Sequence, residues 1–146
     1  MKGVRIVWPQ AAKAEVEECE VGMPKAGEVL IETEYTVVSA GTEKAWLTGM
    51  SNTSKTFPQY LGYSASGRIF EVGEGVNDFK IGDRVVAYHS PHASHAIKST
   101  IDVVRIDDDA IDGKEAAFTI IAAMSLHGIR KAAIELGESV LVIGQG

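Results

Sequence analysis

Apolar and polar positions alternate along residues 1–106 at the two-residue period that is typical of strands. In a short run near the N-terminus, Val4, Ile6 and Trp8 are spaced in this way. The longest run covers residues 28–39, and its apolar face consists of Val29, Ile31, Thr33, Tyr35 and Val37. Further strands are predicted over residues 67–72, 84–88, 93–98 and 101–106. Many short strands that are separated by glycine turns predict a barrel or a sandwich.

The pattern changes to that of a helix at Asp112. Asp112 and Glu115 have the three-residue spacing of a capping box, with Asp112 as the N-cap. The helix is predicted to run to about Leu136, with Gly137 as its C-terminal stop. Nearly every residue over 116–126 is apolar, so we expect this helix to be buried on most sides, in part by something other than a small barrel.

The chain closes with the apolar run Val140–Ile143 followed by Gly144-Gln145-Gly146. A buried parallel strand followed by the first two glycines of a G-x-G-x-x-G turn has this pattern. In such a turn, Gly144 and Gly146 would approach the pyrophosphate of a dinucleotide at a helix N-terminus. An ordinary turn at the end of a strand gives the same two glycines. If the first interpretation holds, these residues are the front part of a longer nucleotide-dependent enzyme.

Composition narrows the classes of partner. The net charge is −6 and no cluster of Lys and Arg occurs, which argues against a nucleic-acid partner. Cys19 is the only cysteine, so an internal disulfide and a cysteine zinc cluster are both excluded. The apolar segments are too short to span a membrane and no secretory pattern occurs, so we expect no membrane partner and a cytoplasmic protein.

Five segments carry recognisable motifs. They are P-K-A-G-E-V-L-I at 24–31, S-A-G-T-E at 39–43, P-Q-Y-L-G-Y-S-A-S-G at 58–67, the glycine hairpin at 72–85, and A-A-M-S-L-H-G with L-G-E-S-V at 122–140. In this order they resemble the medium-chain dehydrogenase/reductase superfamily, the group of zinc-type alcohol dehydrogenases and quinone oxidoreductases. The resemblance implies a mainly β fold with helices. A GroES-like β-barrel catalytic domain would cover residues 1–111, and residues 112–146 would form the linking helix and first strand of a Rossmann domain that is otherwise missing.

The chain departs from the zinc-binding members at every ligand position. Those members hold catalytic zinc with a Cys, a His that is followed by Glu, and a second Cys. The corresponding residues are Ala40, Tyr63, Ser64 and one of Ile120 and Ile121. The proton-relay His of some alcohol dehydrogenases is replaced by Ala45. The resemblance therefore implies the zinc-free branch, and the S-A-G-T-E form is similar to the subgroup of bacteriochlorophyllide hydroxyethyl dehydrogenase.

Two hydroxyl groups are the candidate catalytic donors. The resemblance places Thr42 where family members contact the substrate oxygen, and Tyr63 replaces a zinc ligand, so both should face the active-site cleft. A phenol there can donate a hydrogen bond or a proton to a carbonyl as hydride arrives. The alternatives are a Tyr that fills the vacated metal cavity and a Thr that bonds its own backbone in a turn. Glu43 is expected to order the loop.

His89, His92 and His95 form an H-x-x-H-x-x-H pattern that suggests a metal tract. On a strand, the spacing of three places His92 on the face opposite the other two. We therefore interpret them as ordinary loop or strand histidines and predict no metal site.

The resemblance implies an oxidoreductase that transfers hydride between NAD or NADP and a carbonyl, an alcohol or an activated alkene, without zinc. This chain would be its substrate-side domain and inactive alone. A non-catalytic binding protein that retained the dehydrogenase fold is the alternative. We expect a small-molecule substrate. We also expect a homodimer that forms through residues 112–146, because Phe118, Met124 and their apolar neighbours would otherwise be exposed.

Overall fold

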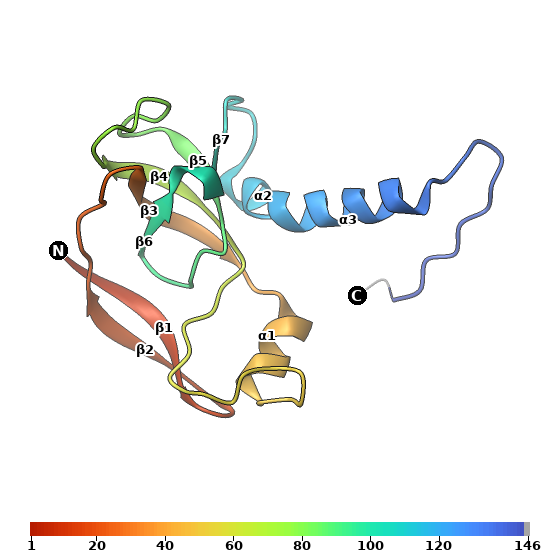
Figure 1. Ribbon diagram of the computed structural model, residues 1–146, viewed down its shortest axis with the longest axis horizontal. Helices are drawn as coiled ribbons and strands as arrows, with labels where there is room; N and C mark the ends of the chain where they lie inside the picture. The colour runs from red at the N-terminus through yellow and green to blue at the C-terminus, as the bar shows by residue number, and fades with distance from the viewer. Residues whose placement is uncertain (145–146) are drawn as a thin grey trace.

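The long strand β3 (Glu28–Val37) lies inside a five-stranded antiparallel sheet in the computed structural model, which describes residues 1–144 (Figure 1). The strand order is β6-β3-β4-β5-β7. The other members are β4 (Ser64–Val72), β5 (Arg84–Tyr88), β6 (His95–Ser99) and β7 (Val103–Arg105), which follows the short 3-10 helix η1 (Thr100–Asp102). The mainly β fold class is confirmed, and the predicted strands are found, except that the one predicted over residues 101–106 is shortened to β7 because its start belongs to η1.

A separate two-stranded sheet is formed by β1 (Lys2–Gln10) and β2 (Lys13–Glu20) (Figure 1). The strand at Val4–Trp8 was predicted, but β2 was not. In β2, Val16 and Cys19 stand among charged residues, so its apolar alternation is weak. The sheet is joined to the rest of the fold by bridges from Arg5 to Ala93 and from Trp8 to Gln59.

The core lies on one face of the larger sheet. It is formed by Val29, Ile31, Ile69, Val85, Ala87 and Val103, with Val72, Val76 and Phe79 packed against it. Val29 and Ile31 are buried in this core as the alternation predicted, whereas Tyr35 is exposed and Val37 is buried outside this cluster. The register between β3 and β4 shifts between Thr33 and Tyr35, and such an irregularity changes the face to which the following side chains point.

Helix α1 (Ala40–Leu47) was not predicted, because residues 1–106 were interpreted as strands and turns. The segment is rich in good helix formers. Its first turn is closed by Glu43, whose carboxylate accepts a hydrogen bond from the backbone N–H of Ser39 at 2.7 Å. The residues of the S-A-G-T-E motif therefore begin a helix.

The predicted helix after Asp112 is divided in two, α2 (Gly113–Ala117) and α3 (Thr119–Ala132). The capping role of Asp112 is confirmed, since its Oδ1 accepts from the N–H of Lys114 at 2.7 Å. The predicted end near Leu136 is wrong, because Ala133 takes a left-handed conformation with φ of 49°. Helix α2 packs on the sheet, whereas α3 extends away from it and has no buried residue (Figure 1). The sheet therefore does not cover α3, and its burial by another surface stays a prediction.

The predicted strand over Val140–Ile143 is not formed, and these four side chains are 59–86% exposed. A parallel strand needs a neighbouring strand for its backbone hydrogen bonds, and residues 1–144 place none beside it. Gly144 has φ of 78°, and Gly146 lies outside the described residues. No helix among the described residues is long and apolar enough to cross a membrane.

Candidate functional site

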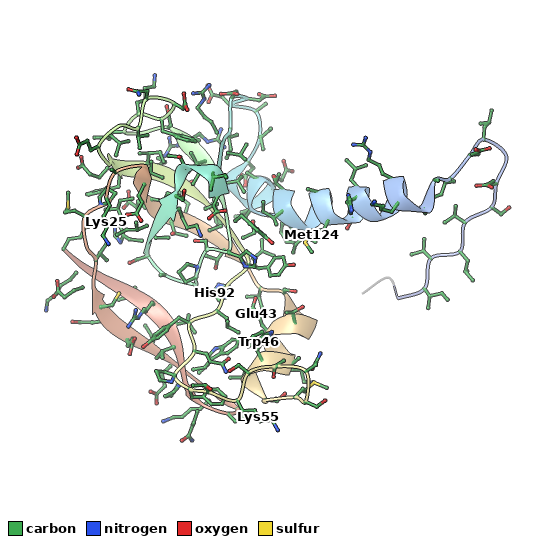
Figure 2. The ribbon with its side chains drawn as sticks, in the orientation of Figure 1. Lys25, Glu43, Trp46, Lys55, His92 and Met124 are labelled. Carbon is green, nitrogen blue, oxygen red and sulfur yellow. The ribbon has the colours of Figure 1, made fainter. Side chains whose placement is uncertain are left out.

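Tyr63 lies immediately before β4 and faces helix α3. Its hydroxyl donates a hydrogen bond to Sδ of Met124 at 3.1 Å, and Met124 is labelled on α3 in Figure 2. The Tyr63 ring packs at a tilt against His89, which in turn packs at a tilt of 51° against Tyr88 at a centroid distance of 3.9 Å. A thioether is a weak acceptor, so the phenol can exchange this partner for a stronger one, such as a carbonyl oxygen.

An apolar groove of about 520 Å³ adjoins this hydrogen bond. It is lined by Tyr88, Ile101, Asp102, Val104, Ile120, Ala123, Met124 and His127. Met124 therefore both borders the groove and holds the Tyr63 hydroxyl. Small-molecule sites have this character, in which apolar walls carry a few placed polar groups.

Thr42 lies in the first turn of α1 with its side chain exposed. Within residues 1–144, the Thr42 hydroxyl makes no hydrogen bond to the backbone. The structure therefore does not show the alternative in which Thr42 bonds its own backbone in a turn. The described contacts do not bring Thr42 and Tyr63 together directly. A ligand could meet the exposed Thr42 hydroxyl directly, whereas the Tyr63 hydroxyl would have to leave Met124 Sδ first.

Beneath Thr42 lies a buried pair that the sequence analysis missed. Glu43 Oε2 and His92 Nε2 are 2.8 Å apart, and each side chain is only 9% exposed (Figure 2). The other ring nitrogen of His92 lies 2.8 Å from the hydroxyl of Thr36. The role of Glu43 as the residue that orders its loop is confirmed by its bond to Ser39. No local spacing signals its partner His92, which is 49 residues away.

A second hollow, of about 310 Å³, is lined on one side by Thr33, Thr36 and His92, and on the other by β1 residues including Arg5. The hydroxyl of Thr33 is buried, and within the described part of the chain it has no hydrogen-bond partner. The hydrogen bond from Arg5 to Glu17 raises the pKa of Arg5 above its usual value, and the guanidinium at this edge of the hollow is paired with the Glu17 carboxylate at 2.7 Å.

The residues at the zinc-ligand positions do not fit the metal. Ala40 offers a methyl group, and the Tyr63 phenol donates to Met124. Ser64 is fully buried, and its hydroxyl donates to the carbonyl oxygen of Ala117 at 2.6 Å. Within residues 1–144, no group of three or more His, Cys, Asp or Glu side chains is placed to hold a metal ion. Zinc in proteins requires thiolate, imidazole or carboxylate ligands, none of which these positions supply.

The three histidines of the suspected tract lie in separate environments. His89 packs between Tyr63 and Tyr88, and His95 contacts the hydroxyl of Ser94 at 3.0 Å. His92 bonds Glu43 and Thr36 instead. The structure therefore does not bring them together as one ligand set.

Comparison with known proteins identifies the fold. The family model described as the alcohol dehydrogenase GroES-like domain matches residues 25–129. The chain belongs to this family. The prediction of the medium-chain dehydrogenase/reductase superfamily is thereby confirmed, and with it the GroES-like domain and an oxidoreductase family.

The curated relatives that this GroES-like domain matches are dehydrogenases. It is 38% identical over 91 residues to S-(hydroxymethyl)glutathione dehydrogenase of Aspergillus oryzae, a match that covers 62% of this chain and 23% of the relative. It is 36% identical over 89 residues to alcohol dehydrogenase class-3 of Drosophila melanogaster, covering 61% of this chain and 23% of that protein. The chain spans about a quarter of the length of these relatives.

Solved structures show the same fold. The quinone oxidoreductase of Coxiella burnetii superposes with a TM-score of 0.82 at 20% identity, over 94% of this chain and 47% of that one. The quinone oxidoreductase of Escherichia coli complexed with NADPH gives 0.75 at 21% identity, over 90% of this chain and 41% of that one. At these identities the likeness establishes the fold alone.

Proposed function

We propose that this GroES-like domain is the substrate-side part of a cytoplasmic, zinc-independent, NAD(P)-dependent oxidoreductase. In the proposal, residues 1–111 are the catalytic domain and residues 112–146 begin the nucleotide-binding domain. The substrate is a small molecule that bears a carbonyl, an alcohol or an activated alkene. The observation that carries the proposal is the Tyr63 hydroxyl, which stands at a former metal-ligand position, held only by a thioether beside an apolar groove.

The chain's own residues would bind and polarise the substrate. The nicotinamide cofactor, when bound, would exchange a hydride at its C4: NADH or NADPH would give it to a carbonyl or alkene, and the oxidised form would accept it from an alcohol. Without a metal to polarise the substrate oxygen, protein hydroxyls must stabilise the negative charge that develops there, and Thr42 and Tyr63 are the two candidates. The groove beside Met124 would hold the apolar part of the substrate and exclude water from it.

Cofactor binding is supported in part by the glycine turn. Gly144 has φ of 78°, the left-handed conformation that glycine adopts without steric cost. Gly144 and Gly146 are proposed to contact the pyrophosphate once the rest of the nucleotide-binding domain is present. The quinone oxidoreductase of Escherichia coli, whose fold this chain shares, is complexed with NADPH. NAD and NADP both remain compatible with the proposal.

The proposal predicts activity without zinc. A protein that joins this domain to its nucleotide-binding domain is expected to oxidise NAD(P)H with a carbonyl or alkene substrate, and to keep this rate after chelation and dialysis. Elemental analysis is expected to find no stoichiometric zinc, because Ala40, Tyr63 and Ser64 cannot bind it. A zinc-containing alcohol dehydrogenase treated in parallel should lose activity. One tightly held zinc per chain would contradict the zinc-independent mechanism.

The exposed helix α3 supports a proposal of self-association. Phe118, Leu126 and Ile129 are each 55–57% exposed at spacings that place them towards one side of the helix, and such a group of exposed large apolar side chains marks an interaction surface. We expect a second copy of the chain to cover them. Light scattering of the 146-residue chain should therefore report a dimer, and Leu126→Lys with Ile129→Lys should shift it towards the monomer.

Ser125→Lys is the matched control for this dimer. It adds one positive charge, against two in the double variant, to the same exposed helix without removing an apolar side chain, so it should leave the dimer largely intact. A strictly monomeric wild-type chain at high concentration would refute self-association through residues 112–146.

A further inference from the structure

His92 connects the two segments that carry the candidate donors. Its side chain bonds Glu43, the residue that follows Thr42 on α1. Its backbone N–H donates to the carbonyl oxygen of Leu61 at 3.1 Å, two residues before Tyr63. Its own carbonyl oxygen accepts from the N–H of Ile6 at 2.8 Å, which fixes it to β1. One residue is therefore tied to both donor segments and to a strand.

Glu43 is the link between His92 and the turn that presents Thr42. One carboxylate oxygen accepts from the N–H of Ser39 at 2.7 Å, and the other meets His92 Nε2 at 2.8 Å. The N–H of Glu43 also donates to the carbonyl oxygen of Ser39 at 2.8 Å. The turn from Ser39 to Glu43 is thus closed on both sides of Thr42, and a buried bond anchors it to His92.

We infer that Glu43 and His92 are positioning residues, which fix Thr42 and Tyr63 relative to each other through a buried hydrogen bond in which His92 Nε2 carries the proton. This inference rests on the proposed function for its catalytic consequence. Neither residue is assigned contact with the substrate.

The proton assignment follows from the partners. A carboxylate only accepts, so the contact between Glu43 Oε2 and His92 requires a proton on Nε2. The Thr36 hydroxyl opposite Nδ1 can donate or accept, so it satisfies that nitrogen in either state. The chain Glu43–His92–Thr36 is therefore fully paired, as buried polar groups must be.

Glu43→Gln tests this assignment because it should reverse the tautomer. The N–H of Ser39 still needs an acceptor, so the new amide oxygen must face Ser39 and its NH₂ must face His92. Nε2 must then accept, and the proton must move to Nδ1, where Thr36 accepts it. We expect ¹⁵N NMR of the 146-residue chain to show the His92 proton on Nε2 in the wild type and on Nδ1 in the variant.

Glu34→Gln is the matched control, since Glu34 lines the same hollow as His92 but bonds Arg68. It should leave the His92 signals unchanged. An unprotonated Nε2 in the wild type, or a proton that stays on Nε2 in Glu43→Gln, would overturn the inference.

A double substitution gives an independent test by stability. Thr36→Val alone removes the hydrogen-bond partner of His92 Nδ1, which carries no proton in the proposed wild-type tautomer. In the Glu43→Gln background the same change leaves a buried Nδ1–H without an acceptor. The combined loss in the folding equilibrium constant should exceed the product of the single losses by roughly five- to a hundredfold. Additive effects would overturn the paired chain.

The catalytic consequence is measured in the protein joined to its nucleotide-binding domain. Glu43→Ala should lower kcat by roughly tenfold with little change in KM, because a misplaced donor acts on the transition state. Glu43→Gln, which keeps the bonds through the tautomer change, should restore most of the rate. When Thr42→Val and Tyr63→Phe are already present, Glu43→Ala should add no further loss.

These measurements separate the two ideas. If Thr42→Val or Tyr63→Phe lowers turnover while Glu43→Ala does not, the positioning role is wrong and the proposed function stands. If neither donor substitution changes turnover, the proposed function of these donors is wrong, and the positioning role for them is overturned with it.

Discussion

Replacing Tyr63 by Phe, or Thr42 by Val, is expected to lower turnover by roughly ten- to a thousandfold, about 1.4–4 kcal/mol, in a protein that joins this domain to the proposed nucleotide-binding domain. Each substitution removes a hydroxyl that would stabilise the charge on the substrate oxygen in the transition state. Cofactor affinity should change little, because neither residue belongs to the glycine turn. Steady-state kinetics with a carbonyl substrate and a separate cofactor titration measure the two quantities.

A substitution of the hydrogen-bond partner of Tyr63 is the control for Tyr63→Phe. Met124→Leu removes the sulfur that accepts the phenol hydrogen bond but leaves the phenol in place. If Tyr63 acts on the substrate, Met124→Leu should keep most of the turnover that Tyr63→Phe loses. Thr42→Ser, which keeps a hydroxyl, should likewise retain activity where Thr42→Val does not.

The opposing interpretation makes a different forecast. If Tyr63 only fills the space that a metal would occupy, Tyr63→Phe keeps nearly all of the side-chain volume and should hardly change turnover. A double variant with turnover near the wild-type value would eliminate both hydroxyls. Attention would then move to His92 and His95, or to a donor on the nucleotide-binding domain.

Strands were predictable where alternation is strong, and helices were less so. Along β3, the apolar period identified Val29, Ile31 and Val37 as buried, and all three are. The same period failed at Tyr35, because a shift in register between neighbouring strands leaves no trace in one strand's own sequence. The break at Phe118 was also missed, since a run of apolar residues does not reveal where one helix ends and the next begins.

Sequence motifs predicted individual residues of the candidate site but not the contacts between them. The motif positions identified Tyr63 and Ser64 as replacements for metal ligands, but not that Ser64 is committed to a helix carbonyl. Likewise, Glu43 could be seen to order its loop, whereas its bond to His92 depends on how the barrel brings two distant segments together. Such pairings are set by tertiary structure, which local spacing does not encode.

The largest expected effect on stability concerns Ser64 and Ser66, which attach α2 to strand β4. Ser64 Oγ donates to the carbonyl oxygen of Ala117, and Ser66 Oγ donates to that of Gly113, both at 2.6 Å. Both serines are almost completely buried, and so is Ala117. These two bonds therefore hold both ends of α2 against the sheet.

The two substitutions should differ in size. The helix breaks at Phe118, so the Ala117 carbonyl has no continuing turn to bond, and Ser64→Ala leaves it buried and unpaired. We expect Ser64→Ala to lower the free energy of unfolding by about 1–3 kcal/mol. Gly113 begins α2 and its carbonyl can bond within the helix, so Ser66→Ala should cost only about 0.5–1.5 kcal/mol.

Urea unfolding of the 146-residue chain measures both effects, with Ser125→Ala as the control. Ser125 bonds the carbonyl oxygen of Ile121 inside α3 and is exposed, so its replacement by a better helix former should be neutral or slightly stabilising. Equal small effects for Ser64→Ala and Ser125→Ala would show that the Ala117 carbonyl finds another partner. A large effect would mean that Ser64 secures α2, and with it the connection to α3, on which Met124 accepts the hydrogen bond of Tyr63.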